Sequence, residues 1–152
     1  MFPEISNDSE REAVNLSNNL QRLNQRSSWK IAKDLPTSFF YAAKGLKYAF
    51  STQRNFRIHV GFAFVAFVLG LFLGLTQSDL AIMALTATSV LVVELLNTAI
   101  ESVVDLAIGT RFHPLAQIAK DCSAGAVLVA SISSLLIAVL LLFPPLLKTL
   151  GI

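Results

Sequence analysis

The chain has 152 residues, of which 54% are hydrophobic and only 14% are charged, and its mean hydropathy is +0.62. Soluble domains carry about 25% charged residues, so the composition excludes an ordinary soluble enzyme and indicates a membrane protein of one domain. The net charge of +2 gives no strong attraction to polyanions such as nucleic acids. A single cysteine, Cys122, excludes an intrachain disulfide.

The first part of the chain is polar. Residues 1–35 are rich in Ser, Asn, Gln and mixed charges, and Met1–Ser28 holds no apolar stretch of the kind found in a cleavable signal peptide. We interpret residues 1–35 as a disordered cytoplasmic extension, followed by a membrane domain at 36–152. Apolar residues recur at helical spacing over about 37–50, which predicts an amphipathic helix on the membrane surface. The alternative is a helix packed into a soluble core.

Three apolar runs follow and predict three transmembrane helices, at about 58–75, 80–106 and 122–143. The polar residues Thr76–Asp79 predict a tight turn between the first two helices. Gly109 and Pro114 break the link to the third, and Pro144-Pro145 is expected to end that helix. The expected fold is therefore an all-α membrane protein with a surface helix and three spans.

The distribution of positive charge predicts the orientation. Nine Lys and Arg residues precede the first apolar run, and the turn after it has none. The second link has Arg111 and Lys120, and the tail has only Lys148. Positive residues favour the cytoplasmic side. The N-terminus and the second link are therefore expected in the cytoplasm, and the C-terminus outside.

The second apolar run ends in a stripe of four polar residues at spacings of 3, 4 and 4, namely Glu94, Asn97, Glu101 and Asp105. At about 100° per residue they fall within about 80° of one another on a helix. An ionisable residue in a span costs about 2.5–3.5 kcal/mol and marks a functional site. With a rise of about 1.5 Å per residue, Glu94 is expected about 9 Å inside the hydrocarbon core and Glu101 at its boundary.

This polar stripe suits phosphoryl transfer from a cytosolic donor to an acceptor in the membrane. Glu94 suits a general base acting on a lipid group. Glu101 and Asp105 suit Mg²⁺, which takes one or two carboxylates together with phosphate oxygens. Lys120 could hold a phosphate, and the adjacent Asp121 could orient it. The sequence has no Gly-x-x-x-x-Gly-Lys-Ser/Thr loop and no Asp-Phe-Gly, so a soluble kinase fold is not expected.

Each polar group also has a simpler interpretation. Glu94 and Asn97 can serve as hydrogen-bonding groups between helices, and Glu101 and Asp105 can form a solvated helix end. Lys120 can act as a topology anchor, and the small residues from 123 to 126 permit close helix packing. At the level of function, the alternatives are a proton-carrying membrane subunit built on Glu94 and a non-enzymatic assembly protein. Neither alternative explains the whole set of polar groups at one membrane face.

Two stretches, ELLNTAIESVVD at 94–105 and FHPLAQIAKDCSAGAV at 112–127, resemble the bacterial integral-membrane diacylglycerol kinase family, which includes undecaprenol kinases. GLKYAFSTQRNFRIH at 45–59 is similar to that family's cytoplasmic segment before the first span, particularly in the undecaprenol kinase branch. The resemblance runs from about Ser38 to the end of the third span. It implies a homotrimer in a bacterial-type inner membrane, with active sites shared between subunits. It also implies Mg²⁺-dependent transfer of the ATP γ-phosphate to the hydroxyl of a lipid alcohol, diacylglycerol or undecaprenol.

The resemblance also implies roles for residues at matching positions. Glu94 would be the general base for the lipid hydroxyl, Asn97 would support it, and Glu101 would bind Mg²⁺. Asn55 and Arg57 would contact the lipid together with Glu94. The nucleotide would be contacted by Tyr41, Glu101, Asp105, Arg111, Phe112, His113, Lys120 and Asp121.

The chain departs from the family pattern at two positions before the first span. Gln53 stands where the family has a glutamate that serves as a second metal ligand. An amide oxygen can still bind Mg²⁺, but it carries no charge, so metal affinity should fall unless another carboxylate helps. Gln53 remains a candidate metal ligand on this basis. Asp34 stands upstream of the surface helix where the family has a basic residue.

Overall fold

The structure is a computed structural model that describes residues 15–16 and 35–151, so the predicted extension at 1–35 lies almost entirely outside the described residues. Over residues 35–151 the chain is helical between short connections, and no strand is present in that range. The predicted all-α class is therefore confirmed. The helices are α2 (Leu35–Thr52), α3 (Arg54–Phe72), α4 (Gln77–Ile108) and α5 (Pro114–Leu150).

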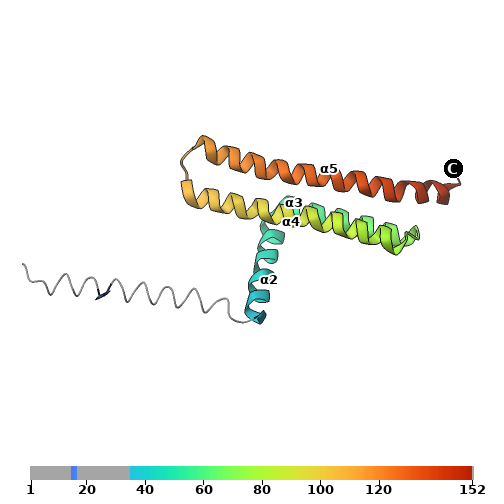
Figure 1. Cartoon of the computed structure of the whole chain (residues 1–152), viewed down its shortest axis with the longest axis horizontal. Helices are drawn as coiled ribbons and strands as arrows, with labels where there is room; N and C mark the ends of the chain where they lie inside the picture. The colour runs from blue at the N-terminus through green and yellow to red at the C-terminus, as the bar shows by residue number, and fades with distance from the viewer. Residues whose placement is uncertain (1–14, 17–34, 152) are drawn as a thin grey trace, which may run out of the picture. The chain divides into compact units, whose positions relative to one another are not determined.

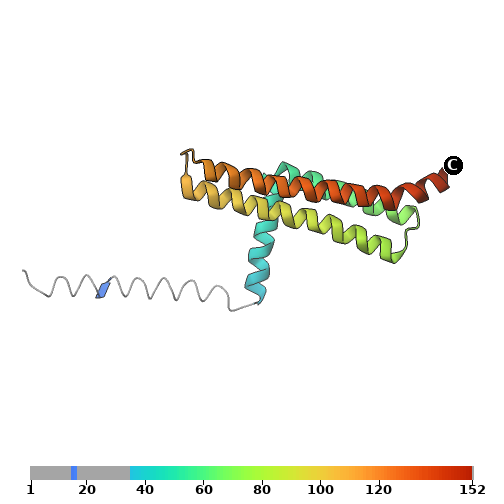
Figure 2. The ribbon, with the colours of Figure 1, turned by 45° about the horizontal axis from the view of Figure 1, so that its top comes forward.

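From Leu46 onward the chain forms one compact unit, which contains the three long helices. Each of α3, α4 and α5 is long and apolar enough to cross a membrane, which confirms the three predicted spans. Figures 1 and 2 show them side by side, and α4 packs against both neighbours, whereas α3 and α5 touch each other little. α4 is therefore the central helix, and it is the helix that carries the polar stripe.

Most apolar side chains of this unit face outward. Phe56, Met83, Val90 and Val127 are buried between helices. Phe62, Phe64, Leu85, Leu128 and many others are more than half exposed. Exposed apolar surface on this scale is incompatible with water and fits a surface covered by lipid or by other subunits.

Gly70 is a buried point of contact between α3 and α4. A Cβ atom built on Gly70 would lie 3.2 Å from Leu80 Cδ2 and 3.3 Å from Met83 Cε. Both distances are shorter than ordinary van der Waals contact. The absence of a side chain at Gly70 therefore lets the two helices pack tightly at the end of the unit that lies nearer their connection.

The connection between α3 and α4 lies earlier in the chain than predicted. Leu73–Thr76 connect the helices, and Gln77–Asp79, which were predicted as part of the turn, form the first turn of α4. The Thr76 hydroxyl accepts a hydrogen bond from the Asp79 amide at 3.2 Å, and the Asp79 carboxylate accepts one from the Thr76 amide at 3.2 Å. This capping box satisfies two backbone donors, which explains why polar residues belong to the helix here.

Replacing Thr76 with Ala is expected to lower the free energy of unfolding by about 1 kcal/mol, because the Asp79 amide loses its acceptor. The measurement is reversible unfolding in mixed micelles, followed by far-ultraviolet circular dichroism. Thr76→Ser keeps the hydroxyl and should retain most of the stability. Equal losses in the two variants would contradict a role for the hydroxyl.

α5 is longer than the predicted third span at both ends. It begins at Pro114, where the fixed φ of proline and its missing amide hydrogen suit a first helical residue. It also continues through Pro144 and Pro145 to Leu150, so the prediction that these prolines end the helix is wrong. A proline inside a helix removes one backbone hydrogen bond and bends the helix, and Figure 2 shows the end of α5 turning aside.

α4 and α5 extend beyond the start of α3. At about 1.5 Å per residue α3 is about 28 Å long, close to the thickness of a hydrocarbon core of about 30 Å. The same length measured along the antiparallel α4 from Gln77 reaches about residue 95, so Glu94 lies level with the start of α3. This position is near the boundary of the hydrocarbon core and not about 9 Å inside it as predicted, because α4 begins three residues before Leu80. The remaining turns of α4 project past α3 alongside α5, as Figures 1 and 2 show. Glu101 and Asp105 belong to this projecting part.

Candidate functional site

The environment of the polar stripe changes along α4. Glu94 is buried, with only 2% of its surface exposed. Its Oε2 has no hydrogen-bond partner in the part of the chain that the structure describes. Asn97 and Glu101 are half-buried, and Asp105 is exposed. The stripe therefore passes from a buried carboxyl, level with the start of α3, to a solvated carboxylate on the projecting part of α4.

α5 contacts this stripe at two points. The Asn97 Nδ2 group donates to Glu101 Oε1 at 3.3 Å within α4. The hydroxyl of Ser123 on α5 donates to Asn97 Oδ1 at 2.6 Å. Farther along, Lys120 Nζ of α5 forms an ion pair with Asp105 Oδ1 at 2.5 Å. One contact between the helices thus joins two predicted site residues, Asp105 and Lys120, and the other joins Ser123 to Asn97, which bonds to Glu101 within α4.

The hydroxyl groups on the same stretch of α4 bond to their own helix. Thr98 Oγ1 donates to the Glu94 carbonyl at 3.0 Å, and Ser102 Oγ donates to the Thr98 carbonyl at 2.8 Å. Serine and threonine commonly satisfy their hydrogens in this way inside helices. These two hydroxyls therefore do not donate hydrogen bonds to the carboxylates of Glu94 and Glu101.

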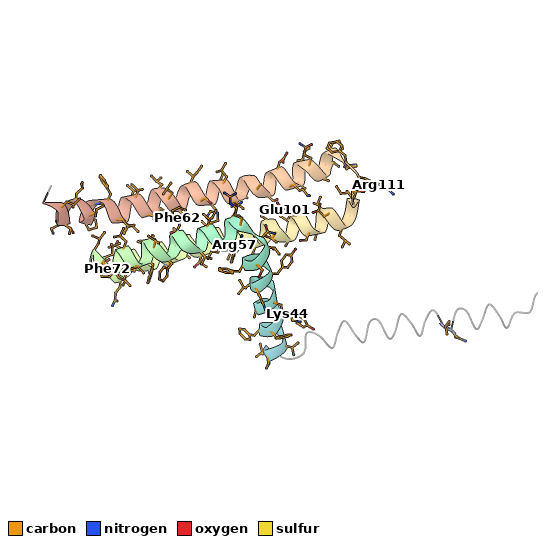
Figure 3. All side chains as sticks on the ribbon, turned by 180° about the vertical axis from the view of Figure 1, so that it is seen from behind. Lys44, Arg57, Phe62, Phe72, Glu101 and Arg111 are labelled. Carbon is orange, nitrogen blue, oxygen red and sulfur yellow. The ribbon has the colours of Figure 1, made fainter. Side chains whose placement is uncertain are left out.

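The link between α4 and α5 places three predicted nucleotide contacts at one end of the unit. Gly109 ends α4 with a φ of 59°, in the region that favours glycine. Arg111 and Phe112 are exposed, and Figure 3 shows Arg111 at the far end from Phe72. His113 caps α5, since its Nδ1 accepts a hydrogen bond from the Leu115 amide at 3.2 Å.

The helix is interrupted between α2 and α3, and side-chain hydrogen bonds stabilise this interruption. Gln53 is the single residue between α2 and α3, and it has an extended backbone with φ −94° and ψ 112°. Arg57 Nη1 donates to the carbonyls of Phe50 and Ser51 at 3.0 and 3.1 Å, which satisfies two acceptors at the end of α2. Asn55 is exposed. Within residues 35–151, none of the side chains of Gln53, Asn55 and Arg57 hydrogen-bonds to the α4 stripe.

Two further predicted contacts are exposed side chains. Tyr41 lies on α2, where its ring packs edge-on against Phe40 with the ring centroids 5.8 Å apart. Lys44 Nζ lies 4.4 Å from the Phe40 ring and 5.6 Å from the Tyr41 ring. These are cation–π distances. Asp121 is exposed beside Lys120, and its side chain makes no hydrogen bond among the residues that the structure covers.

The oxygen atoms of the site fit Mg²⁺ only as part of a ligand set that also includes phosphate oxygens and water. No group of three or more His, Cys, Asp or Glu side chains in the described ranges comes together around a point that could hold a metal. Mg²⁺ is usually held by one or two carboxylates, phosphate oxygens and waters, rather than by a cage of protein ligands alone. Glu101 offers a carboxylate in such a set, and Gln53 offers an amide oxygen. The residues present therefore fit a metal that arrives with a phosphate.

A mainly apolar cavity of about 320 Å³ lies between α3, α4 and α5. Its α4 wall runs from Met83 to Val90, which is one turn before Glu94. The cavity therefore lies on the apolar side of Glu94, away from Glu101 and Asp105. The few polar groups that line it are His59, Thr86, Ser131 and Ser134.

Sequence reasoning gave no functional role to two residues at this site. Ser123 was predicted only to permit close packing, although it stands three residues after Lys120, a spacing that puts both on one helix face. His59 was not singled out. It is half-buried on the wall of the cavity that lies one turn before Glu94. The polar composition of residues 51–59 marked this segment as unusual in the sequence, but it did not single out His59.

Comparison with known proteins matches residues 40–142 to the family described as prokaryotic diacylglycerol kinase. The chain is 48% identical over 124 residues to a diacylglycerol kinase of Synechocystis, which covers 82% of this chain and 71% of that one. It is 39% identical over 109 residues to an undecaprenol kinase of Bacillus subtilis, with 72% and 88% covered. It is 34% identical over 103 residues to a diacylglycerol kinase of Escherichia coli K12, with 68% and 84% covered.

Proposed function

The chain belongs to the prokaryotic diacylglycerol kinase family and is a lipid kinase of the membrane, and we propose that it transfers the γ-phosphate of ATP to the hydroxyl of a lipid alcohol in the presence of Mg²⁺. The observation that carries this proposal is the position of Glu94. This buried carboxyl has the apolar cavity on one side and the Asn97–Glu101 and Asp105–Lys120 pairs on the other. A lipid acceptor and a phosphate donor would approach it from opposite directions.

Glu94 is the proposed general base. It accepts the proton of the lipid hydroxyl while the hydroxyl oxygen attacks the γ-phosphorus, and the bond from that phosphorus to the β,γ-bridging oxygen breaks to release ADP. Its Oε2, without a hydrogen-bond partner in the residues described, is available for this proton. The cavity lined by Met83 and Val90 would receive the apolar chains of the lipid, and Asn55 and Arg57 would contact its polar end.

The projecting part of α4 and α5 is the proposed nucleotide site. Lys120 would hold a phosphate, and Glu101, with Gln53 as a second candidate ligand, would hold Mg²⁺, which neutralises charge on the phosphates when bound. The other proposed nucleotide contacts are Tyr41, Asp105, Arg111, Phe112, His113 and Asp121. Glu101, Asp105 and Lys120 lie on two helices that pack against each other, and their hydrogen bonds and ion pair hold these three side chains in place before substrate arrives.

The proposed orientation puts this projecting part in the cytoplasm, where ATP is available. Nine Lys and Arg residues before the first apolar run support a cytoplasmic N-terminus, and Arg111 and Lys120 support a cytoplasmic link. The C-terminus would then lie outside. We also propose a homotrimer with active sites shared between subunits. The large exposed apolar surface of α3, α4 and α5 is available for contacts between the subunits.

The first candidate acceptor is diacylglycerol, because a relative at 48% identity is a diacylglycerol kinase. The second is undecaprenol, because residues 45–59 resemble the undecaprenol kinase branch and a relative at 39% identity is an undecaprenol kinase. The test uses full-length protein in micelles with Mg²⁺ and ATP labelled at the γ-phosphate. We expect labelled lipid with one of these two alcohols. An absence of labelled lipid with diacylglycerol, undecaprenol and ceramide alike would contradict the proposed reaction.

Gln53→Glu is expected to lower the Mg²⁺ concentration that gives half-maximal rate, because a charged carboxylate replaces a neutral amide as a metal ligand. The expected change is about tenfold, the size typical of gaining or losing one interaction at a metal site. The measurement is the initial rate against Mg²⁺ at fixed ATP. An unchanged Mg²⁺ dependence would show that residue 53 is not a ligand.

A further inference from the structure

We infer that Ser123 is a positioning residue for the proposed metal site, acting on Glu101 through the amide of Asn97. This inference rests on the proposed function, because it needs Glu101 to hold Mg²⁺. Three groups form one hydrogen-bonded chain across the two helices. The Ser123 hydroxyl donates to Asn97 Oδ1 at 2.6 Å, and Asn97 Nδ2 donates to Glu101 Oε1 at 3.3 Å.

The direction of this chain is fixed by the chemistry of its ends. An ionised carboxylate only accepts hydrogen bonds, so the NH₂ edge of Asn97 must face Glu101. The amide oxygen of Asn97 then faces α5, and it needs a donor there. Ser123 Oγ supplies that donor. The Lys120 carbonyl lies 2.9 Å from the same hydroxyl but competes for its single hydrogen less effectively at that longer distance.

The burial of Ser123 makes this hydroxyl hard to replace. Only 7% of the Ser123 surface is exposed. Without the hydroxyl, Asn97 Oδ1 would lose its partner on α5, and the amide would no longer be held in one orientation. A turned amide would present its oxygen to Glu101, and two acceptors repel each other. Ser123 therefore keeps the donor edge of Asn97 on Glu101 Oε1, and the second carboxylate oxygen of Glu101 would then be available to hold Mg²⁺.

A role for Ser123 in helix packing alone predicts that loss of its hydroxyl does not change Mg²⁺ binding. The neighbours of Ser123, which are Ala124, Gly125 and Ala126, show that small size at this part of α5 needs no hydroxyl. If packing were the whole role, Ser123→Ala would be harmless. Ser133 provides the matched control, because it lies on the same helix, is exposed, and donates only to the Val129 carbonyl of α5.

The test measures Mg²⁺ binding without catalysis. The thermal unfolding midpoint of full-length protein in micelles is followed while Mg²⁺ is added at a fixed concentration of a non-hydrolysable ATP analogue. Ser123→Ala is expected to raise the half-saturating Mg²⁺ concentration about three- to tenfold, the effect of one neutral hydrogen bond. Ser133→Ala should match wild type, and Ser123→Thr, which keeps the hydroxyl, should recover most of the loss. In an Asn97→Ala background, Ser123→Ala should add nothing.

The outcomes separate this inference from the proposed metal site. If Glu101→Gln shifts the Mg²⁺ titration while Ser123→Ala matches Ser133→Ala, the role of Ser123 is overturned and the metal site stands. The role is also overturned if Ser123→Ala has the same effect with and without Asn97. If Glu101→Gln leaves the titration unchanged, the proposed metal site and the inference fall together.

Discussion

Glu94→Gln is expected to lower kcat by about 10²- to 10⁴-fold, the range that a positioned general base contributes. Glutamine has nearly the same size and can still hydrogen-bond, so the variant removes little except the ability to take a proton. The buried position of Glu94 makes the substitution benign for folding, because a neutral amide costs less to bury than a charged carboxylate. The measurement is the rate of labelled lipid formation at saturating ATP and lipid.

Two controls make this result specific to Glu94. Binding of the non-hydrolysable ATP analogue should stay near the wild-type value, because Glu94 faces the lipid in the proposed site. Asp79→Asn alters another carboxyl of α4, in the first turn of the helix, and should leave kcat unchanged. A Glu94→Gln variant with wild-type kcat would make Glu94 a structural carboxyl and would refute its assignment as the base.

Exchanging the charges of the Asp105–Lys120 pair is the second decisive change. In the double variant Asp105→Lys, Lys120→Asp, we expect kcat/KM for ATP to fall by about 10²-fold, as expected when one charged group that holds a phosphate is lost. The exchange keeps the attraction between α4 and α5 but moves the cation from α5 to α4. In the proposed site, the phosphate would then meet a carboxylate on α5 in place of the ammonium group of Lys120.

The fold should survive this exchange. Lys120 is 37% exposed and Asp105 is 60% exposed, and ion pairs at such positions contribute only about 0–1 kcal/mol to stability. Unfolding in mixed micelles should therefore change little. Recovery of wild-type kcat/KM in the exchanged variant would mean that the pair only joins the two helices. Lys120→Arg should retain more activity than the exchange, because the cation stays on α5.

The sequence predicted the architecture well because apolar composition and helical period dominate a membrane chain. The all-α class and the three spans follow from the apolar runs alone, and Gly109 and Pro114 mark the second link correctly. The boundaries were less predictable because they depend on local hydrogen bonds. Thr76 looked like a turn residue and is a helix cap, and Pro144 and Pro145 lie within a helix that bends and continues.

The polar stripe was predictable in part, for a related reason. Residues on one helix show their shared face through spacing, so the four polar groups of α4 could be grouped from the sequence. Contacts between helices depend on how α5 is rotated against α4, which spacing does not give. The Lys120–Asp105 and Ser123–Asn97 contacts therefore required the structure. The roles assigned to the site residues all stay predictions, and those of Gln53, Asn55, Arg57 and Tyr41 rest on family resemblance alone.

The unequal helix lengths have a consequence for how the bilayer itself would influence the enzyme. α3, with 19 residues, matches the hydrocarbon thickness, whereas α4 and α5, with 32 and 37 residues, exceed it by many ångströms. A mismatch between helix length and bilayer thickness would therefore act on α3, and the position of α3 would set the depth of all three helices in the membrane. Because Glu94 lies level with the start of α3, a thicker membrane would move this proposed catalytic carboxyl away from the aqueous phosphate donor, and a thinner one would expose it to water. Membrane thickness would then act as a rate-controlling variable alongside substrate concentration.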